Sequence, residues 1–298
     1  MKLATFRDAG ARGAERRIGI ALDAEIVDLA EAAPELPRDM VGFLAAGEAA
    51  LELARRACRG SVGRRPLESV HLEAPLPRPP ELLAVGLNYA DHVAETGREA
   101  PKFPLLFNKQ SSCVTGPTDP VELPRVSQAL DYEGEMAFVI GRRCRHVDVR
   151  RAAEVIAGYT IVDDLSVRDW QLKSPTMTLG KSFDTHGPMG PWIVTPDELP
   201  DPHDLDLRTF VNGEERQRSN TRQLVFDCFS LVQTLSTVMT LEPGTVVSTG
   251  TPGGVGVARK PPEFLKVGDS VRVEVDGIGW IENRVIAEPG EGAPGRRQ

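Results

Sequence analysis

The apolar residues of this chain fall mostly into short runs separated by glycine, proline and charged residues. The clearest runs are rich in β-branched and aromatic residues, a composition typical of β-strands: MAFVI, YTIV, PWIVT, LRTFVNG, TVVSTG, SVRVEVD and GWIENRV. Apolar residues at helical spacing are confined to fewer segments, at about residues 40–57, 148–157, 165–173 and 224–239. The pattern therefore predicts the α+β class, a mainly β-fold with a few helices and largely antiparallel strands.

A proline-rich stretch divides the chain into a short N-terminal part and a longer remainder. The N-terminal segment from KLATF to EIVDL has short alternating patches typical of a small β-unit, and the helix expected at 40–57 follows it. Next comes EAPLPRPPELL, whose prolines cannot lie inside a helix or a central strand and favour a stiff linker. We therefore expect a small N-terminal α/β domain at 1–74, a catalytic domain at 75–287 and a disordered tail at 288–298.

The segment LDYEGEMAFVIG carries two glutamates whose spacing suits a metal site. Side chains two apart on a strand share a face, so Glu133 and Glu135 are expected to project together. Two anions held that close are unfavourable unless a cation lies between them. Asp164, where the strand-like YTIV gives way to a helix-like run, is the expected third ligand. Oxygen ligands favour Mg²⁺, Mn²⁺ or Ca²⁺ over zinc. An isolated E-x-E pair, however, more often lies on the solvent-exposed face of an antiparallel strand.

His92 and Glu95 are three residues apart and would lie on one face of a helix. A carboxylate that orients an imidazole raises its basicity and makes it a general base that works near neutral pH. Most such pairs are ordinary contacts on a helix surface. The turn-forming residues of TGREAPKFP follow the pair, so we expect a mobile surface segment that closes over a bound acid.

Four further residues are candidates for contacts with a substrate. Arg168 and Gln171 repeat the three-residue spacing one turn beyond Asp164, and their side chains suit a carboxylate and a carbonyl oxygen, respectively. We expect Arg168 to act on the substrate and not on the fold, although an ordinary solvated helix face gives the same spacing. Lys181 could hold a developing negative charge if buried, but a single lysine is more often on the surface. Thr251 lies in STGTPGGVG, a glycine-rich loop without the ending of a phosphate loop.

Composition narrows the classes of partner. The chain has 298 residues with 35 Lys and Arg against 43 Asp and Glu, a formal net charge of −8, which argues against binding to nucleic acid or to an anionic membrane. The N-terminal MKLATFRDAGARG has no apolar core of signal-peptide length, and no run approaches a membrane span, so we expect a cytoplasmic protein. The four cysteines are scattered without C-x-x-C spacing and are expected to be reduced, mainly structural thiols.

Six segments in order make the chain resemble the fumarylacetoacetate hydrolase family: GLNYADHVAE, LFNKQSSCVTGP, DYEGEMAFVIG, DDLSVRDWQ, GKSFDTHGPMGPW and TGTPGGVG. They are spread over most of residues 83–285, and the N-terminal residues match only the small domain that many members carry. The resemblance implies a flattened β-roll catalytic domain, usually in a homodimer. It also implies a divalent metal on Glu133, Glu135 and Asp164, and substrate contacts from Arg168, Gln171, Lys181 and Thr251. It further implies that His92 and Glu95 form a catalytic dyad, with the histidine as general base, on a mobile lid.

The resemblance also implies a set of reactions on small 2-oxo acids. Members hydrolyse carbon–carbon bonds in β-diketo acids, decarboxylate oxaloacetate, or interconvert isomers of 2-oxo acids from the catabolism of aromatic compounds. In each branch a metal would stabilise an enolate, Lys181 would neutralise the oxyanion, and His92 would move a proton or activate water. SFDTHGPMGP and PPEFLKVGD resemble 2-hydroxyhepta-2,4-diene-1,7-dioate isomerases and the vertebrate domain-containing type 2 members more than fumarylacetoacetate hydrolase itself.

Our first expectation is hydrolysis of an acylpyruvate-type β-diketo acid. The alternative is isomerase or tautomerase action on a 2-oxo dicarboxylic acid, or decarboxylation. A non-catalytic protein that binds a metal and a small acid is a remote alternative, because both His92 and Lys181 are present.

Overall fold

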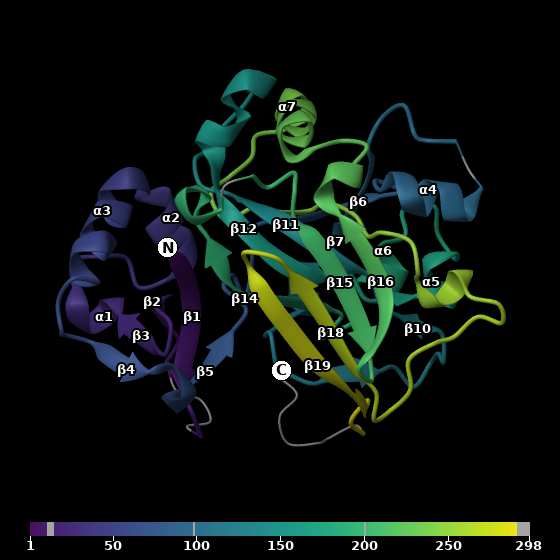
Figure 1. Ribbon diagram of the computed structural model, residues 1–298, viewed down its shortest axis with the longest axis horizontal. Helices are drawn as coiled ribbons and strands as arrows, with labels where there is room; N and C mark the ends of the chain where they lie inside the picture. Colours follow the sequence, from purple (N-terminus) through teal and green to yellow (C-terminus); the bar gives the residue numbers. More distant parts are fainter. Residues whose placement is uncertain (11–14, 98, 200, 291–298) are drawn as a thin grey trace.

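The structure is a computed structural model that describes residues 1–10, 15–97, 99–199 and 201–290. Long strands form its centre, and short helices lie around them (Figure 1). This arrangement confirms the predicted α+β class, mainly β with a few helices. Of the tail expected at 288–298, residues 291–298 lie outside the described residues.

One large sheet runs through the molecule. Its strands follow in the hydrogen-bonded order β4 (Arg64–Pro66), β3 (Glu25–Asp28), β2 (Arg17–Ala21), β1 (Lys2–Asp8), β14 (Gly187–Val194), β12 (Ile156–Asp163), β11 (Gly134–Ile140), β17 (Val246–Ser248), β6 (Leu82–Gly86) and β7 (Leu105–Lys109). Beside this path, β5 (Val70–Glu73) pairs with β1, and β8 (Val114–Thr115) pairs with β14. Most of the pairs are antiparallel, as predicted, whereas β17 runs parallel to β6.

A second sheet packs against the large one. Its order is β16 (Glu214–Asn220), β15 (Asp206–Val211), β18 (Ser270–Val275), β19 (Gly279–Ala287) and β9 (Val121–Leu123). The strand β18 alternates buried valines with partly exposed polar residues, so one face of this sheet meets the core and the other meets solvent.

The α-helices are short and lie around the sheets, with α7, α2 and α3 packed on the faces of the large one. They are α1 (Leu29–Ala32), α2 (Met40–Ala45), α3 (Gly47–Ala57), α4 (Ala90–Thr96), α5 (Arg168–Gln171), α6 (Thr178–Lys181) and α7 (Cys228–Val238). The helix expected at 40–57 is divided into α2 and α3 because Gly47 has a φ of +65°, which interrupts the helical backbone. The helix expected at 224–239 is α7, which starts after Asp227, whose side chain accepts a hydrogen bond from the Ser230 N–H.

Two predicted helices take other forms. The segment at 148–157 contains the 3₁₀-helix η3 (Val149–Val155). The segment at 165–173 begins as the short strand β13 (Ser166–Val167), which pairs with β10 (Leu130–Asp131) before α5 starts. Pairing with a strand more than thirty residues earlier decides this difference, and helical spacing within the segment gives no sign of it.

The run MAFVI lies within β11 and is buried on both of its faces. Met136, Phe138 and Ile140 belong to a core that also contains residues of α7 and of the second sheet. Ala137 and Val139 belong to another core, which contains residues of β1, α2 and α3. A strand buried on both faces needs apolar residues throughout, so this run does not alternate.

The N-terminal strands continue the large sheet. Lys2 and Leu3 of β1 pair with Val194 and Ile193 of β14, so the two expected domains share one hydrogen-bonded sheet. The boundary at 74/75 stays a prediction. No helix in the described part of the chain is long and apolar enough to cross a membrane.

Candidate active site

Three carboxylates meet where β11 begins and β12 ends. Antiparallel pairing sets Gly134 opposite Asp163 and brings these two strand ends together. Glu133 and Glu135 flank Gly134, and Asp164 follows Asp163 and donates its N–H to the Glu133 carbonyl at 2.8 Å. One oxygen from each of Glu133, Glu135 and Asp164 lies within 4.8 Å of the others, and all three side chains are buried. The grouping expected from the sequence is present.

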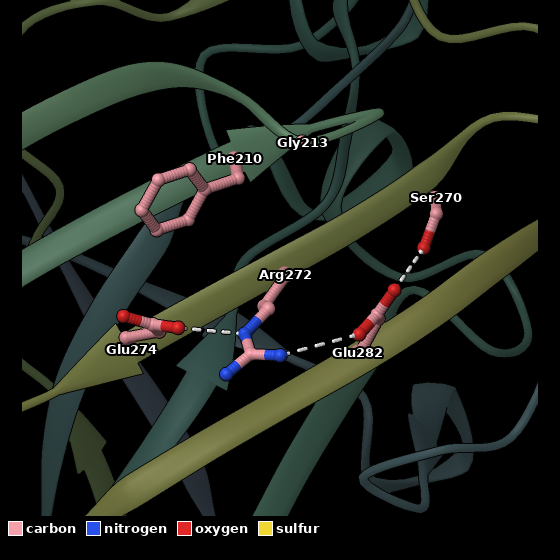
Figure 2. A pocket seen from close by; sticks show the side chains of 6 residues that line it. All are labelled: Phe210, Gly213, Ser270, Arg272, Glu274 and Glu282. Carbon is pink, nitrogen blue, oxygen red and sulfur yellow. Dashed lines mark hydrogen bonds and ion pairs between the residues drawn. The ribbon is translucent and has the colours of Figure 1, made fainter.

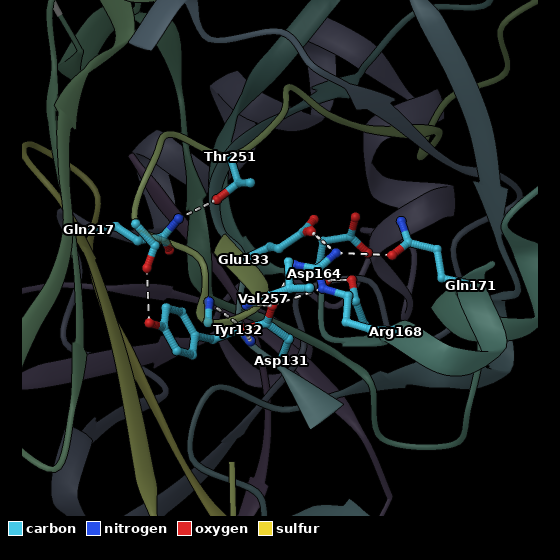
Figure 3. A network of polar contacts seen from close by, with 12 residues as sticks. Asp131, Tyr132, Glu133, Asp164, Arg168, Gln171, Gln217, Thr251 and Val257 are labelled. Atoms are coloured by element: carbon cyan, nitrogen blue, oxygen red, sulfur yellow. Dashed lines mark hydrogen bonds and ion pairs between the residues drawn. The ribbon is translucent and has the colours of Figure 1, made fainter. Parts of the chain in front are cut away.

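Two lysines and an arginine lie against these carboxylates. Lys181 Nζ is 2.6 Å from both Glu133 Oε2 and Asp164 Oδ2. Lys109 Nζ is 2.7 Å from Asp164 Oδ1. Arg168 Nη1 is 2.6 Å from Glu133 Oε1, and Figure 3 shows the guanidinium beside this carboxylate. Lys181 is buried and not on the surface where a single lysine is more often found, and Lys109 was not anticipated.

Glu135 lacks such a partner. Its Oε2 accepts hydrogen bonds from the Ser248 hydroxyl at 2.5 Å and from the Gly250 N–H at 2.8 Å. None of the ion pairs among the described residues includes Glu135. Burial raises the pKa of Glu135 well above its ordinary value, and the charges of Asp164 and Glu133 raise it further. An additional cation would relieve this repulsion, and three buried carboxylates suit a hard divalent ion such as Mg²⁺ or Mn²⁺.

The expected lid residues lie on α4, which contacts the glycine-rich loop that also binds Glu135. His92 Nδ1 is 3.1 Å from Glu95 Oε2, the contact that the three-residue spacing predicts. Glu95 Oε1 accepts a hydrogen bond from the Gly254 N–H at 3.0 Å, which fastens α4 to the glycine-rich loop. Burial alone would raise the pKa of Glu133, but Lys181, Arg168 and, more weakly, His92 hold it well below its ordinary value. The imidazole therefore makes a small contribution to the low pKa of the Glu133 carboxyl.

Arg168 lies inside the protein and is held by acidic groups. Its Nε donates to Asp131 Oδ2 at 2.8 Å, and its Nη2 lies 2.7 Å from the same oxygen (Figure 3). Asp131 also accepts from the backbone N–H groups of Gly256 and Val257, at 2.8 and 3.0 Å. Arg168 therefore joins Glu133 to the glycine-rich loop through Asp131. This network gives the side chain a part in the fold, which the sequence analysis did not expect.

Gln171 and Thr251 lie around the same network with different freedom to bind a ligand. Gln171 Oε1 accepts from Arg168 Nη1 at 3.0 Å, while its Nε2 has only a long contact of 3.5 Å to the Met177 sulfur. Thr251 donates its hydroxyl proton to the Gly134 carbonyl at 3.0 Å and accepts from Gln217 Nε2 at 2.8 Å. Gln171 thus keeps a donor for a substrate oxygen, whereas Thr251 is committed largely to anchoring its loop.

Sequence reasoning missed Lys109, Asp131 and Ser248. Asp131 continues the period of two that selected Glu133 and Glu135, so the same pattern could have included it. Lys109 and Ser248 end strands β7 and β17 and carry no local signal that separates them from surface residues.

Replacing Arg168 with methionine should destabilise the protein. The change leaves the buried Asp131 carboxylate without its cation, and breaking one side of a buried ion pair costs about 3–5 kcal/mol. Urea denaturation at neutral pH measures the loss. Arg218→Met is the matched control, because its ion pair with Glu215 is exposed and should contribute little. Equal stability of the two variants would contradict a structural role for Arg168.

A separate hollow of about 310 Å³ lies on the second sheet and is lined by Phe210, Gly213, Ser270, Arg272, Glu274 and Glu282 (Figure 2). Arg272 Nε donates to Glu274 at 2.7 Å, and Ser270 donates its hydroxyl to Glu282 at 2.8 Å. Because its charged groups already pair with one another, this hollow is a weaker candidate than the carboxylate cluster.

A β-rich fold that gathers three carboxylates, two buried lysines and a His–Glu pair has the arrangement of an enzyme for small anionic substrates. The family model described as fumarylacetoacetate (FAA) hydrolase C-terminal matches residues 81–286. The chain therefore belongs to the fumarylacetoacetate hydrolase family, which confirms the resemblance seen in its motifs.

Two vertebrate relatives match most of the chain. The oxaloacetate tautomerase fahd2, mitochondrial, of Xenopus laevis is 44% identical over 274 residues, covering 91% of this chain and 86% of that protein. The oxaloacetate tautomerase FAHD2A, mitochondrial, of Homo sapiens is 42% identical over 288 residues, covering 96% of this chain and 92% of that protein.

Solved structures share the whole architecture. A putative HpcE protein from Mycobacterium smegmatis has a TM-score of 0.85 at 37% identity, covering 96% of this chain and 99% of that one. Maleylpyruvate hydrolase from Sphingobium sp. SYK-6, solved with manganese(II) and pyruvate, has a TM-score of 0.79 at 33% identity, covering 97% and 100%. A probable 2-hydroxyhepta-2,4-diene-1,7-dioate isomerase from Mycobacterium abscessus has a TM-score of 0.80 at 30% identity, with the same coverage. The chain is thus an enzyme of a family of hydrolases, isomerases and tautomerases of 2-oxo acids.

Proposed function

We propose that this chain is a divalent-metal-dependent tautomerase that interconverts the keto and enol forms of an oxaloacetate-type 2-oxo dicarboxylic acid. The observation that carries the proposal is the His92–Glu95 pair, which binds Gly254 of the same loop whose Gly250 N–H binds Glu135 of the carboxylate cluster. Similarity to oxaloacetate tautomerases over most of both chains supports the reaction class. Hydrolysis, our first expectation from the sequence, is less well supported than this alternative.

In this proposal Glu133, Glu135 and Asp164 hold the metal, and Mg²⁺ or Mn²⁺ fits their oxygen atoms better than a soft ion does. When bound, the ion would polarise the 2-oxo group of the substrate and favour loss of a proton from the neighbouring carbon. The similar hydrolase solved with manganese(II) and pyruvate supports the pairing of such a metal with a 2-oxo acid.

His92 is the base in this reaction. With Glu95 accepting from the Nδ1–H, the lone pair at Nε2 is free to take a proton from C3 of the substrate. The C3–H bond breaks, a C2–C3 double bond forms, and the 2-oxo oxygen receives a proton to give the enol. The imidazole returns its proton in this last step, so the enzyme ends the cycle unchanged.

The surrounding donors hold the substrate oxygens. Lys181 carries a buried ammonium that can offset negative charge developing on the 2-oxo oxygen. Gln171 Nε2 is a further donor toward a ligand, and Arg168 orients the amide through its contact with Gln171 Oε1. Thr251 supports the loop to which Glu95 binds, and so helps to place the base.

Hydrolysis of an acylpyruvate is the second candidate, favoured by the similarity to maleylpyruvate hydrolase. In this reaction His92 would activate water for attack on a second carbonyl, and the carbon–carbon bond would break to release an acid and the enol of pyruvate. The same residues serve both reactions, so substrate shape decides between them.

A direct comparison of the two reactions tests the proposal. With Mg²⁺ or Mn²⁺ present, the enzyme should speed the decay of enol absorbance in oxaloacetate far beyond the metal alone, and should speed deuterium exchange at C3. Acylpyruvates assayed in parallel should release little pyruvate. Rapid cleavage of an acylpyruvate without faster enol decay would overturn the tautomerase assignment and favour the hydrolase.

Three other expectations remain part of the proposal. The partner is a small 2-oxo acid, the native metal is Mg²⁺ or Mn²⁺, and the protein forms a homodimer. A cytoplasmic location is also only part of this proposal, since the names of the vertebrate relatives place those proteins in mitochondria.

A further inference from the structure

Lys109 is a buried lysine at the end of β7 that lies beside the carboxylate cluster. Its Nζ is 2.7 Å from Asp164 Oδ1, and it also donates a hydrogen bond to the backbone carbonyl of Lys181. We propose that Lys109 is a positioning residue of the active site. It keeps Oδ1 of Asp164 from the metal, so that Asp164 offers one oxygen only, and it fixes the backbone that carries Lys181. The inference rests on the proposed function.

The same arrangement recurs at Glu133, where one carboxylate oxygen is held by a fixed donor. Arg168 Nη1 lies 2.6 Å from Oε1 of Glu133, as Lys109 Nζ lies 2.7 Å from Oδ1 of Asp164. The other oxygens, Glu133 Oε2 and Asp164 Oδ2, converge on a single point, because Lys181 Nζ is 2.6 Å from each. These two oxygens share the Lys181 ammonium, so positive charge is already stabilised at the point between them.

Glu135 follows the same rule with neutral donors. Its Oε2 accepts hydrogen bonds from the Ser248 hydroxyl and from the Gly250 N–H, so Oε1 is the oxygen left for a metal. Glu133 and Asp164 thus each have one oxygen held by a separate cation and one that shares the Lys181 ammonium, whereas Glu135 has one oxygen held by neutral donors. Mg²⁺ and Mn²⁺ commonly take six oxygen ligands, so three single-oxygen carboxylates leave room for both oxygens of a 2-oxo acid. A second oxygen from Asp164 would occupy part of that room.

An alternative is that Lys109 only neutralises Asp164 in the fold. The two roles predict opposite changes in metal affinity when Lys109 is removed. A cation near a metal site repels the metal, so its removal should strengthen metal binding if the site keeps its shape. Removal of a purely structural residue should weaken metal binding, stability and turnover together. A positioning role predicts tighter or equal binding of Mn²⁺ with lower turnover.

The test uses Lys109→Met, which keeps the length of the side chain and removes its charge and donors. Lys109→Gln is the second variant, because it retains a donor for the Lys181 carbonyl and is the more tolerant change if the first variant does not fold. Lys102→Met is the matched control on the exposed segment before β7. Mn²⁺ affinity is measured by calorimetry, and the water bound to Mn²⁺ by proton relaxation.

We expect both Lys109 variants to bind Mn²⁺ at least as tightly as wild type, with lower relaxation per bound ion as the second Asp164 oxygen replaces water. Affinity of the Mn²⁺ form for oxalate should fall, and kcat should fall about 10- to 100-fold, the usual effect of changing a group that orients a metal ligand. Lys109→Gln should lose less kcat because Lys181 keeps its backbone contact, and Lys102→Met should match wild type.

Two results would overturn the inference. One is wild-type relaxation and kcat in the Lys109 variants; the other is weaker Mn²⁺ binding that falls together with melting temperature and turnover. If wild type binds Mn²⁺ and accelerates tautomerisation in either case, the proposed function stands and only the role of Lys109 is rejected. If wild type itself binds no Mn²⁺, both are rejected.

Discussion

Glu135→Gln should abolish turnover while leaving the metal-free protein at least as stable as metal-free wild type. Glu135 is buried and its Oε2 is bound by neutral donors, Ser248 and Gly250, while the nearby charges of Glu133 and Asp164 repel it. Glutamine has the same shape and can still accept both hydrogen bonds, but it removes the charge that a metal would balance. Metal catalysis is worth several kcal/mol, so activity should fall about 10³-fold or more.

Three measurements check this expectation. After EDTA treatment and its removal, wild type should lose activity, and Mg²⁺ or Mn²⁺ should restore it. Melting temperature should rise on addition of Mn²⁺ in wild type but not in Glu135→Gln. Glu282→Gln, a change on the second sheet, should behave as wild type. Full turnover by metal-free wild type, or a normal response of Glu135→Gln to Mn²⁺, would remove Glu135 from the metal site.

His92→Ala should lower kcat about 10²- to 10⁴-fold, the usual contribution of a general base, without changing affinity for Mn²⁺. The imidazole lies near Glu133 and holds no place among the three carboxylates, so its loss should leave the metal ligands in position. Glu95→Gln should lower kcat less, because the imidazole remains but loses the charge that orients it.

A second His–carboxylate pair provides the control. His71 Nε2 lies 2.9 Å from Asp119 Oδ1, on β5 and away from the carboxylate cluster, so His71→Ala should keep wild-type kcat. In wild type, kcat should fall at low pH because the base becomes protonated. This fall should disappear in His92→Ala and remain in His71→Ala. Wild-type kcat in His92→Ala would leave the pair as a helix-surface contact and make Lys181 the first candidate for proton transfer.

The local spacing of residues in the sequence predicted the fold class and several contacts of the candidate site. Short runs rich in β-branched residues predicted the mainly β class, and the period of two along a strand predicted that Glu133 and Glu135 would lie together. The three-residue spacing of His92 and Glu95 predicted their contact on α4. These features follow from backbone geometry over a few residues, so they can be read without knowledge of the fold. The family was recognised separately, from the resemblance of six ordered motifs to its members.

Only the tertiary structure decided how the site is held together. Lys109 meets Lys181 across 72 positions, and Ser248 meets Glu135 across 113 positions. The inward position of Arg168 depends on β13 pairing with β10, which brings its guanidinium to Asp131 and removes it from the solvated face that spacing allows. Such contacts form because an unpaired buried charge is costly, so each buried charged group pairs with one that the packed strands bring near. These partners are far apart in the sequence, so the local pattern of residues does not predict them.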